Sequence, residues 1–135
     1  MAVSLNSSQI GLTRRESMTV IRAELAAEFR SGDDVVLLAA DGSGIAAFAS
    51  GLEKAIKHGT SQLENNGITH EISMRDGESG VDLNGDRVVW RFDPAKADEV
   101  IAYLHALSTN DRPGHQYVDI SKPTDTLVIS RDEYV

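Results

Sequence analysis

The sequence contains no cysteine among its 135 residues. A disulfide framework, a thiolate metal site and a cysteine nucleophile are therefore excluded. The absence of cysteine is typical of a protein from a reducing compartment, and we expect a cytoplasmic location, with the periplasm as the open alternative.

Long apolar runs are also missing. No segment approaches the roughly 20 consecutive apolar residues that a membrane-spanning helix needs. The N-terminal segment "MAVSLNSSQIGLTRRES" has no basic stretch followed by an apolar stretch, so we expect no secretory signal. The chain is 41% hydrophobic and 25% charged, which is ordinary for a soluble globular protein. Its length predicts one domain spanning residues 1–135.

Basic residues are few relative to acidic ones, and the formal net charge is −8. An anionic protein repels phosphate groups, so we expect it to bind neither nucleic acid nor membrane. The same charge favours a basic protein partner, because long-range attraction accelerates association. Solubility alone is the alternative explanation of the acidic surface.

The first predicted element is a helix over residues 13–31. Thr13 and Glu16 have the spacing of a capping box, and Gly32 follows as a C-terminal cap. Apolar side chains recur at helical spacing at Met18, Ile21, Leu25 and Phe29. Residues 1–12 are expected to form an arm or an edge strand.

The rest of the chain reads as two tandem β-α-β-β units, residues 35–84 and residues 87–133. Each begins with an apolar strand, continues with an amphipathic helix and ends with alternating strands. The predicted fold is α+β. It is a two-layer structure in which a mixed, mostly antiparallel sheet of about six strands carries the helices on one face, with an extra N-terminal helix.

The stretch "GVDLNGDRVVWRFD", residues 80–93, fits both a calcium loop and a hairpin. Oxygen-bearing side chains at positions one, three, five and twelve of the loop pattern are Asp82, Asn84, Asp86 and Asp93. The sixth position, which requires glycine in a calcium loop, is Arg87. Asn84-Gly85 is a strong hairpin signal, and "RVVWRF" alternates like a strand. We therefore predict a hairpin and no metal.

Histidine is the main candidate for chemistry in a chain without other catalytic motifs. His58 and His105 fall near the ends of predicted helices, where a cation is favourable, and His70 is expected to be a semi-buried, hydrogen-bonded residue. The sequence lacks a G-x-S-x-G nucleophile motif, a P-loop and an H-E-x-x-H metal motif. We therefore predict that the protein is not an enzyme and holds no cofactor.

One alternative keeps catalysis open. His115, Tyr117 and Asp119 share one face of a predicted strand, and the same sheet is expected to present Arg87 and Arg91 nearby. Such a face could support an active site. We favour a polar surface facing solvent.

The two runs "VVLLAADGSGIAAFASGLEKAIKHG…ITHEIS" and "RVVWRFDPAKADEVIAYLHAL…GHQYVDIS…TLVISRDEY" share a rhythm of strand, helix and polar strands. This rhythm resembles that of small, acidic bacterial immunity proteins of polymorphic or contact-dependent toxin systems. The resemblance covers residues 35–133. It implies a cytoplasmic inhibitor that binds a cognate toxin domain, which is often basic, and blocks its active site. The duplication and the N-terminal helix depart from that family.

Under this hypothesis the partner contacts are expected at acidic turns, at the acidic C-terminal residues and on the polar sheet face. The candidate residues are Asp76, Glu78, Asp82, Asp86, Arg91, Tyr117, Asp119, Asp132, Glu133 and Tyr134. Tyrosine and arginine often dominate binding energy, which adds Tyr103 as a candidate. The alternative function is a regulatory module that binds a small molecule in a pocket between the two repeat units and their helices.

Overall fold

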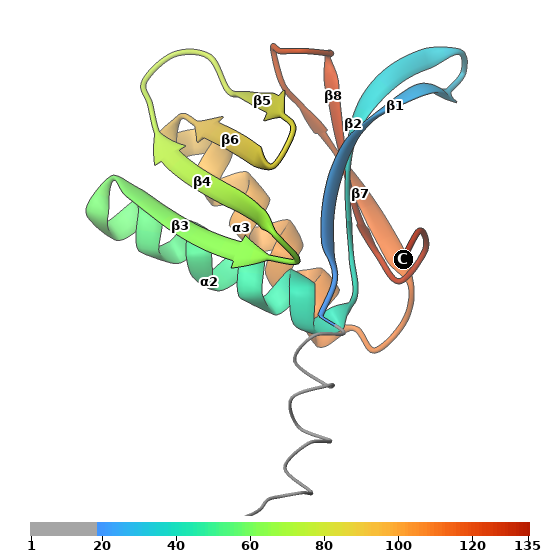
Figure 1. Cartoon of the computed structure of the whole chain (residues 1–135), viewed down its shortest axis with the longest axis horizontal. Coiled ribbons are helices and arrows are strands. Elements are labelled where there is room, and N and C mark those ends of the chain that lie inside the picture. The colour runs from blue at the N-terminus through green and yellow to red at the C-terminus, as the bar shows by residue number, and fades with distance from the viewer. Residues whose placement is uncertain (1–18) are drawn as a thin grey trace, which may run out of the picture.

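Strands contribute more residues than helices to the structure, a computed structural model that describes residues 19–135 (Figure 1). The elements in chain order are β1 (Ile21–Arg30), β2 (Asp33–Ala40), α2 (Gly42–His58), β3 (Thr60–Asn65), β4 (Ile68–Met74), β5 (Gly80–Asn84), β6 (Arg87–Phe92), α3 (Pro94–Thr109), β7 (Gly114–Asp119) and β8 (Thr126–Arg131). The predicted α+β class is confirmed. Neither helix of this described part is both long and apolar enough to cross a bilayer.

The strands form two four-stranded sheets: sheet A in the order β1-β2-β8-β7 and sheet B in the order β3-β4-β6-β5. The pairs β1–β2, β3–β4, β5–β6 and β7–β8 are antiparallel hairpins. The central pairs β2–β8 and β4–β6 are parallel. The predicted single sheet of about six strands under one helical layer is therefore wrong. Strand order depends on long-range pairing, which periodicity along the chain does not encode.

The element order repeats, but the repeated unit is β-β-α-β-β and differs from the predicted β-α-β-β. The first half is β1-β2-α2-β3-β4, and the second half is β5-β6-α3-β7-β8. Each central parallel pair joins a strand of the first half to one of the second, so the halves interlock. The predicted division at residues 84 and 87 placed β5 in the first unit, whereas its pairing with β6 puts it in the second.

The predicted helix over residues 13–31 is wrong where the structure describes it, because Ile21–Arg30 is strand β1. Strand β2 is buried on both faces and needs hydrogen-bond partners on both edges; β1 supplies them on the side away from β8. The turn between them uses Ser31 and Gly32, both with positive φ, as expected for a tight hairpin. The predicted arm at residues 1–12 and the capping box at Thr13 lie outside the described residues.

Two further hairpins define sheet B. Strand β3 lies in a polar segment that no sequence pattern predicted as a strand, and a turn at Asn66-Gly67 joins it to β4. The predicted hairpin in "GVDLNGDRVVWRFD" is confirmed as β5–β6. Asn84 pairs with Arg87, so the turn residues are Gly85 and Asp86.

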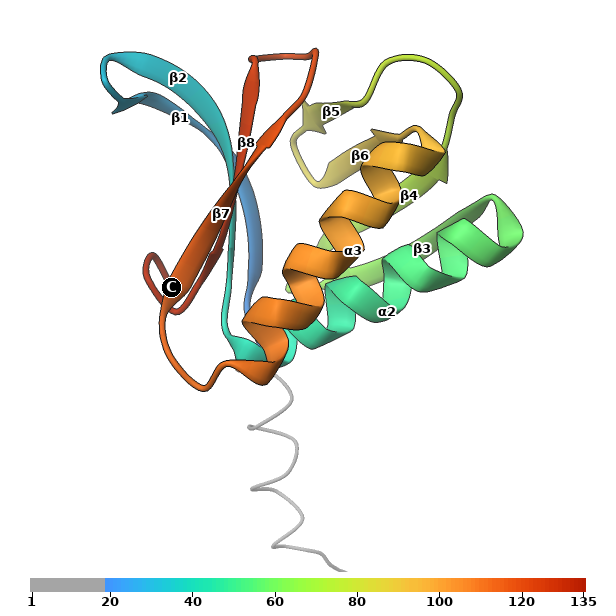
Figure 2. The same cartoon turned by 180° about the vertical axis from the view of Figure 1, so that it is seen from behind.

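The two helices pack against each other, α2 also against β3 and β4, and α3 against β6 and β7 (Figure 2). Both N-termini are capped by aspartate: Asp41 Oδ1 accepts from the amide of Gly44, and Asp93 Oδ1 accepts from that of Lys96. One main hydrophobic core includes residues from both halves. The structure therefore buries its apolar surface only when both halves are present.

His70 lies in this core, fully buried beside Trp90. The Trp90 indole Nε1 donates to His70 Nδ1 at 3.1 Å, in agreement with the expected hydrogen-bonded histidine. Its Nε2 has no hydrogen-bond partner of standard geometry among the described residues. Burial lowers the pKa of His70, and the nearby backbone of Ile21 offsets only part of that effect. His70 is therefore a neutral core residue at neutral pH.

Candidate functional site

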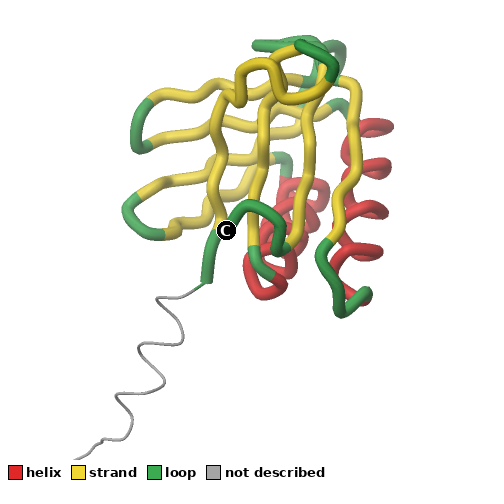
Figure 3. The backbone as a smooth tube through the Cα atoms, turned by 90° about the vertical axis from the view of Figure 1, so that its right-hand side faces the viewer, coloured by secondary structure: helices red, strands yellow, loops and turns green. Residues whose placement is uncertain are grey.

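The outer face of sheet A, turned away from the helices, is the first candidate surface (Figure 3). Its centre is apolar and buried, and consists of Val35, Leu37, Ala39 and Val128. Ala26 and Phe29 of β1 pack against this centre. The strand register puts Tyr117 of β7 opposite Val128 and Glu24 of β1 opposite Leu37. Polar and aromatic side chains therefore flank an apolar strip.

The C-terminal residues Asp132–Val135 lie across this face (Figure 3). The Ser130 hydroxyl donates to Glu133 Oε1 at 2.6 Å, and His115 Nδ1 lies 3.0 Å from Glu133 Oε2. The Tyr134 ring meets Phe29 edge-on, with 5.6 Å between ring centroids. These contacts fix the end of the chain against the sheet.

The Glu133 carboxylate is held in its charged form. Burial alone would raise the pKa of Glu133, but the hydrogen bonds from Ser130 and His115, with the charge of His115, lower it overall. The His115 ring in turn meets Tyr117 edge-on, at 5.2 Å between centroids. A chain of contacts thus runs from Glu133 through His115 to Tyr117.

Several predicted contact residues come together here. Tyr117, Asp119, Glu133 and Tyr134 all belong to the outer face of sheet A. Asp132 lies at its margin, where it accepts a hydrogen bond from Arg131 Nε at 3.1 Å. Tyr117 and Tyr134 are 39% and 43% exposed, and Val135 is 54% exposed. Large side chains and carboxylates are thus available to a partner on one face.

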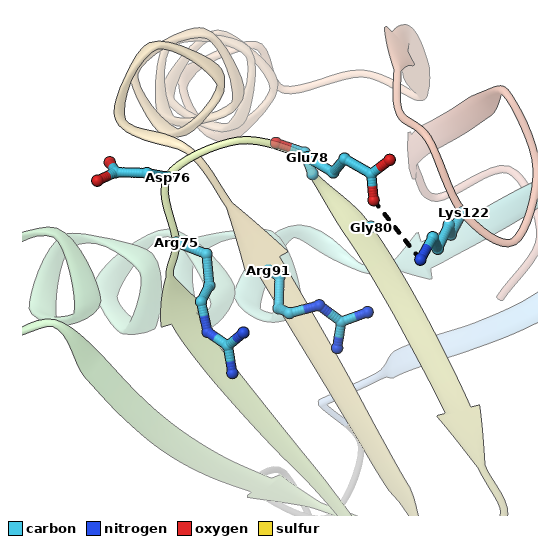
Figure 4. Close-up of a pocket in the computed structure, with 7 residues that line it drawn as sticks. Arg75, Asp76, Glu78, Gly80, Arg91 and Lys122 are labelled. Carbon is cyan, nitrogen blue, oxygen red and sulfur yellow. Dashed lines mark ion pairs between the residues drawn. The ribbon is translucent and has the colours of Figure 1, made fainter.

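A second group of predicted residues surrounds a cavity of about 450 Å³ (Figure 4). It is lined by Arg75, Asp76, Glu78, Ser79, Gly80, Arg91 and Lys122. The chain passes from the first half to the second at this point, through the loop between β4 and β5. The alternative function expected a pocket between the repeat units and their helices. This cavity lies at the junction of the halves, whereas the helices pack on each other.

Arg91 is partly neutralised beside the cavity. Its Nη1 lies 2.6 Å from Asp82 Oδ2. The hydrogen bond with Arg91 lowers the pKa of Asp82 despite partial desolvation, and the same bond raises the pKa of Arg91. Asp82 is therefore engaged with an arginine. Among residues 19–135, no group of three or more histidine or acidic residues has an arrangement that could hold a metal ion.

Other predicted residues lie apart from both groups. Asp86 occupies the β5–β6 turn, and Tyr103 packs against the core from α3. Arg87 and Arg91 lie on β6 in sheet B, whereas His115 lies on β7 in sheet A. The expectation that one sheet would present these arginines beside His115 is therefore wrong, because the strands belong to different sheets.

Arg131 is an important residue that the sequence did not reveal. Its Nη1 donates to the carbonyls of Leu107, Ser108 and Asn110, at 2.7, 3.2 and 2.7 Å, and so caps the C-terminus of α3. No signal in the sequence pairs the end of β8 with that helix. Arg75 and Lys122 were also missed, because isolated cations next to turns are common on surfaces.

Comparisons with known proteins give no relative for this chain: no family model, no curated protein and no solved structure matches it.

Proposed function

We propose that the chain is a protein–protein inhibitor that binds a basic partner through the outer face of sheet A, as an immunity protein binds and neutralises a toxin domain. The observation that carries this proposal is the gathering of Tyr117, Tyr134 and Val135 beside carboxylates on one face. Catalysis would instead need a nucleophile or a general base aimed into a cavity.

The tyrosines supply binding energy in this proposal. Tyrosine buries a large ring with little loss of side-chain freedom, and it is enriched among residues that dominate interfaces. The aromatic contacts with Phe29 and His115 hold the two rings in place before binding. A partner that covers them gains apolar burial from a surface that is already ordered.

The carboxylates supply the preference for a basic partner. Asp119 on β7 and Glu24 on β1 lie at opposite margins of the face and are exposed, although Glu24 also lies 3.8 Å from Arg22 Nε. Together with the net charge of −8, they favour fast association with a basic surface, and salt weakens this attraction. Covering a basic active site with this face would exclude its substrate.

The test is co-expression with the protein encoded by the neighbouring gene, followed by affinity measurement. We expect protection against that protein's toxicity, and a loss of roughly 10- to 100-fold in affinity for Tyr117→Ala or Tyr134→Ala. Ile56→Ala, on α2 and 40% exposed, is the matched control and should bind normally.

A charge variant distinguishes long-range electrostatic attraction from direct contact with the partner. Asp119→Asn should slow association and reduce its salt dependence, whereas Asp98→Asn on α3 should change neither. The proposal is wrong if the chain protects against no neighbouring toxin, or if the tyrosine variants bind as tightly as the Ile56 variant.

A further inference from the structure

The side chains of Arg75 and Arg91 lie on the same side of sheet B. Ser73 of β4 pairs with Arg91 of β6, and Arg75 is two residues further along, so strand alternation puts it on the face shared by Ser73 and Arg91. The backbone amide of Arg75 donates to the carbonyl of Phe92 at 2.9 Å and so continues the strand pairing. Figure 4 shows both guanidinium groups extending in the same direction.

The carboxylates around the cavity leave these cations incompletely neutralised. Asp82 pairs with Arg91, and Glu78 lies 3.5 Å from Lys122. Asp76 points away from both guanidinium groups (Figure 4). Within the described part of the chain, no carboxylate lies within ion-pair distance of Arg75. Among the described residues, Arg75 thus has no ion-pair partner in a cavity where Arg91 is paired with Asp82 and Lys122 with Glu78.

Backbone contacts fix two of the segments that line the cavity. The amide of Val81 donates to the carbonyl of Lys122 at 3.0 Å, and the amide of Ser121 donates to that of Ser79 at 2.8 Å. These bonds tie the start of β5 to the loop between β7 and β8. The Lys122 side chain is therefore anchored at its base beside Gly80 while its amino group reaches the cavity.

We propose that this cavity binds a small molecule through an oxyanion group, a carboxylate or a phosphate, held by Arg75 and Arg91. Guanidinium groups donate two parallel hydrogen bonds to such groups and recognise their planar or tetrahedral oxygens. The Lys122 amino group supplies a third cation. The cavity volume of about 450 Å³ falls within the range of small-ligand sites, about 300–1,000 Å³.

This site is separate from the outer face of sheet A, so either proposal can fail while the other stands. It is tested on the full chain by NMR titration with inorganic phosphate and, separately, with succinate; the tighter of the two identifies the oxyanion class. We expect saturable shifts at the Arg75 and Arg91 side chains and at the Gly80 amide. Arg75→Gln should weaken binding about tenfold.

The matched control is Arg87→Gln. Arg87 lies on the same face of the same strand as Arg91 and pairs with Glu71 outside the cavity. Both variants change the net charge equally. A loss of anion affinity in Arg75→Gln alone therefore identifies a specific site, whereas an equal loss in both variants indicates only general electrostatic attraction of the anion. Equal loss, or no saturable shift with either anion, overturns the proposal.

A variant with the opposite expected sign sharpens the test. Asp82→Asn releases Arg91 from its carboxylate and should tighten anion binding, by about threefold. Asp86→Asn removes the same charge from the turn of the same hairpin and should have a smaller effect. If Asp82→Asn weakens binding, the proposed role of Arg91 is wrong.

Discussion

The outer faces of the two sheets differ although both sheets have the same arrangement of hairpins around a parallel pair. In sheet A the central strands β2 and β8 are buried on both faces almost throughout. In sheet B the central strand β6 alternates, with Val88, Trp90 and Phe92 buried and the residues between them more exposed. The apolar strip on the outer face of sheet A is packed by β1 residues and flanked by residues 132–135, whereas the outer face of sheet B carries the ion pairs Arg87–Glu71 and Arg91–Asp82.

The difference shows which side chains specify the framework. The inner faces of both sheets contribute to one apolar core, so the repeated architecture depends on them. Both outer faces carry ion pairs, but only that of sheet A is built around a buried apolar strip. One outer face presents aromatic and acidic groups, and the other presents arginines beside a cavity.

The largest contrast is expected from truncating one outer-face residue in each sheet. Leu37 is 3% exposed, so Leu37→Ala should lower the free energy of unfolding by about 2–4 kcal/mol. Val89 is only partly buried on the outer face of sheet B, and Val89→Ala should cost less than about 1 kcal/mol. Urea denaturation of both variants measures the contrast, and equal losses would contradict it.

A second contrast concerns the ends of β8 and β4. Arg131 pairs with Ala40, and Met74 pairs with Phe92, so the two residues hold equivalent positions in the two halves. Arg131→Met puts methionine at both equivalent positions and removes the cap of α3. The free energy of unfolding is expected to fall by about 1.5–3 kcal/mol. Arg112→Met, on the exposed loop after α3, is the control for charge. Thermal unfolding should give a lower melting temperature for Arg131→Met than for Arg112→Met. A wild-type melting temperature for Arg131→Met would contradict the capping role.

The third contrast is in pH dependence. Because burial lowers the pKa of His70, the unfolded chain binds its proton more readily than the folded chain. The stability contributed by neutral His70 is therefore present above its ordinary pKa of 6.5 and falls as the pH drops below it. Replacing His70 with Gln should flatten the decline in unfolding free energy between about pH 7 and pH 5. An unchanged slope for His70→Gln would contradict this account.

The smallest contrast compares two carboxylates on the outer faces. Glu133 accepts hydrogen bonds on sheet A with a side chain 24% exposed, so Glu133→Gln should cost about 1 kcal/mol. Glu71 is similarly exposed, at 26%, and pairs with Arg87, but its contact with the Ser73 hydroxyl is 3.5 Å long against 2.6 Å for Ser130 and Glu133, so Glu71→Gln should cost less than about 0.5 kcal/mol. Chemical denaturation at matched pH resolves the difference, and a larger loss for Glu71→Gln would reverse the expected order.

Periodicity predicted the elements whose patterns are unambiguous. Strand β2, both helices and the last two strands were expected because apolar runs, aspartate caps and alternation agree there. Strand β3 was missed because "TSQLEN" is a polar edge strand whose only large apolar residue is Leu63. Its strand form depends on pairing with β4, which no local signal reports.

The error at β1 has a geometric reason. Ile21 and Leu25 are four residues apart, a spacing that lies on one face of a helix and equally on one face of a strand. A shift in register after Ala26 then carries Phe29 to the outer face of sheet A. The alanine- and glutamate-rich segment favours a helix, but pairing with β2 overrides that preference.

The candidate surfaces were predictable residue by residue, but their grouping was not. Tyr117 and Asp119 were expected on one face because they alternate along one strand. The meeting of Glu133 with His115 requires the adjacency of β7 and β8 and the course of the final residues. The cavity needs the contact between Lys122 and Gly80, which joins loops far apart in the sequence.

The parallel pairing of β2 with β8 has a consequence for how the protein is made. During translation, β2 leaves the ribosome long before β8. The backbone groups on one edge of β2 therefore stay without their final partner until the second half has emerged. Contacts between residues this distant in sequence slow folding. The apolar surface that the nascent chain exposes in the meantime favours aggregation. Chaperones should therefore bind a ribosome-stalled chain that ends before β8, and they should not bind the completed protein.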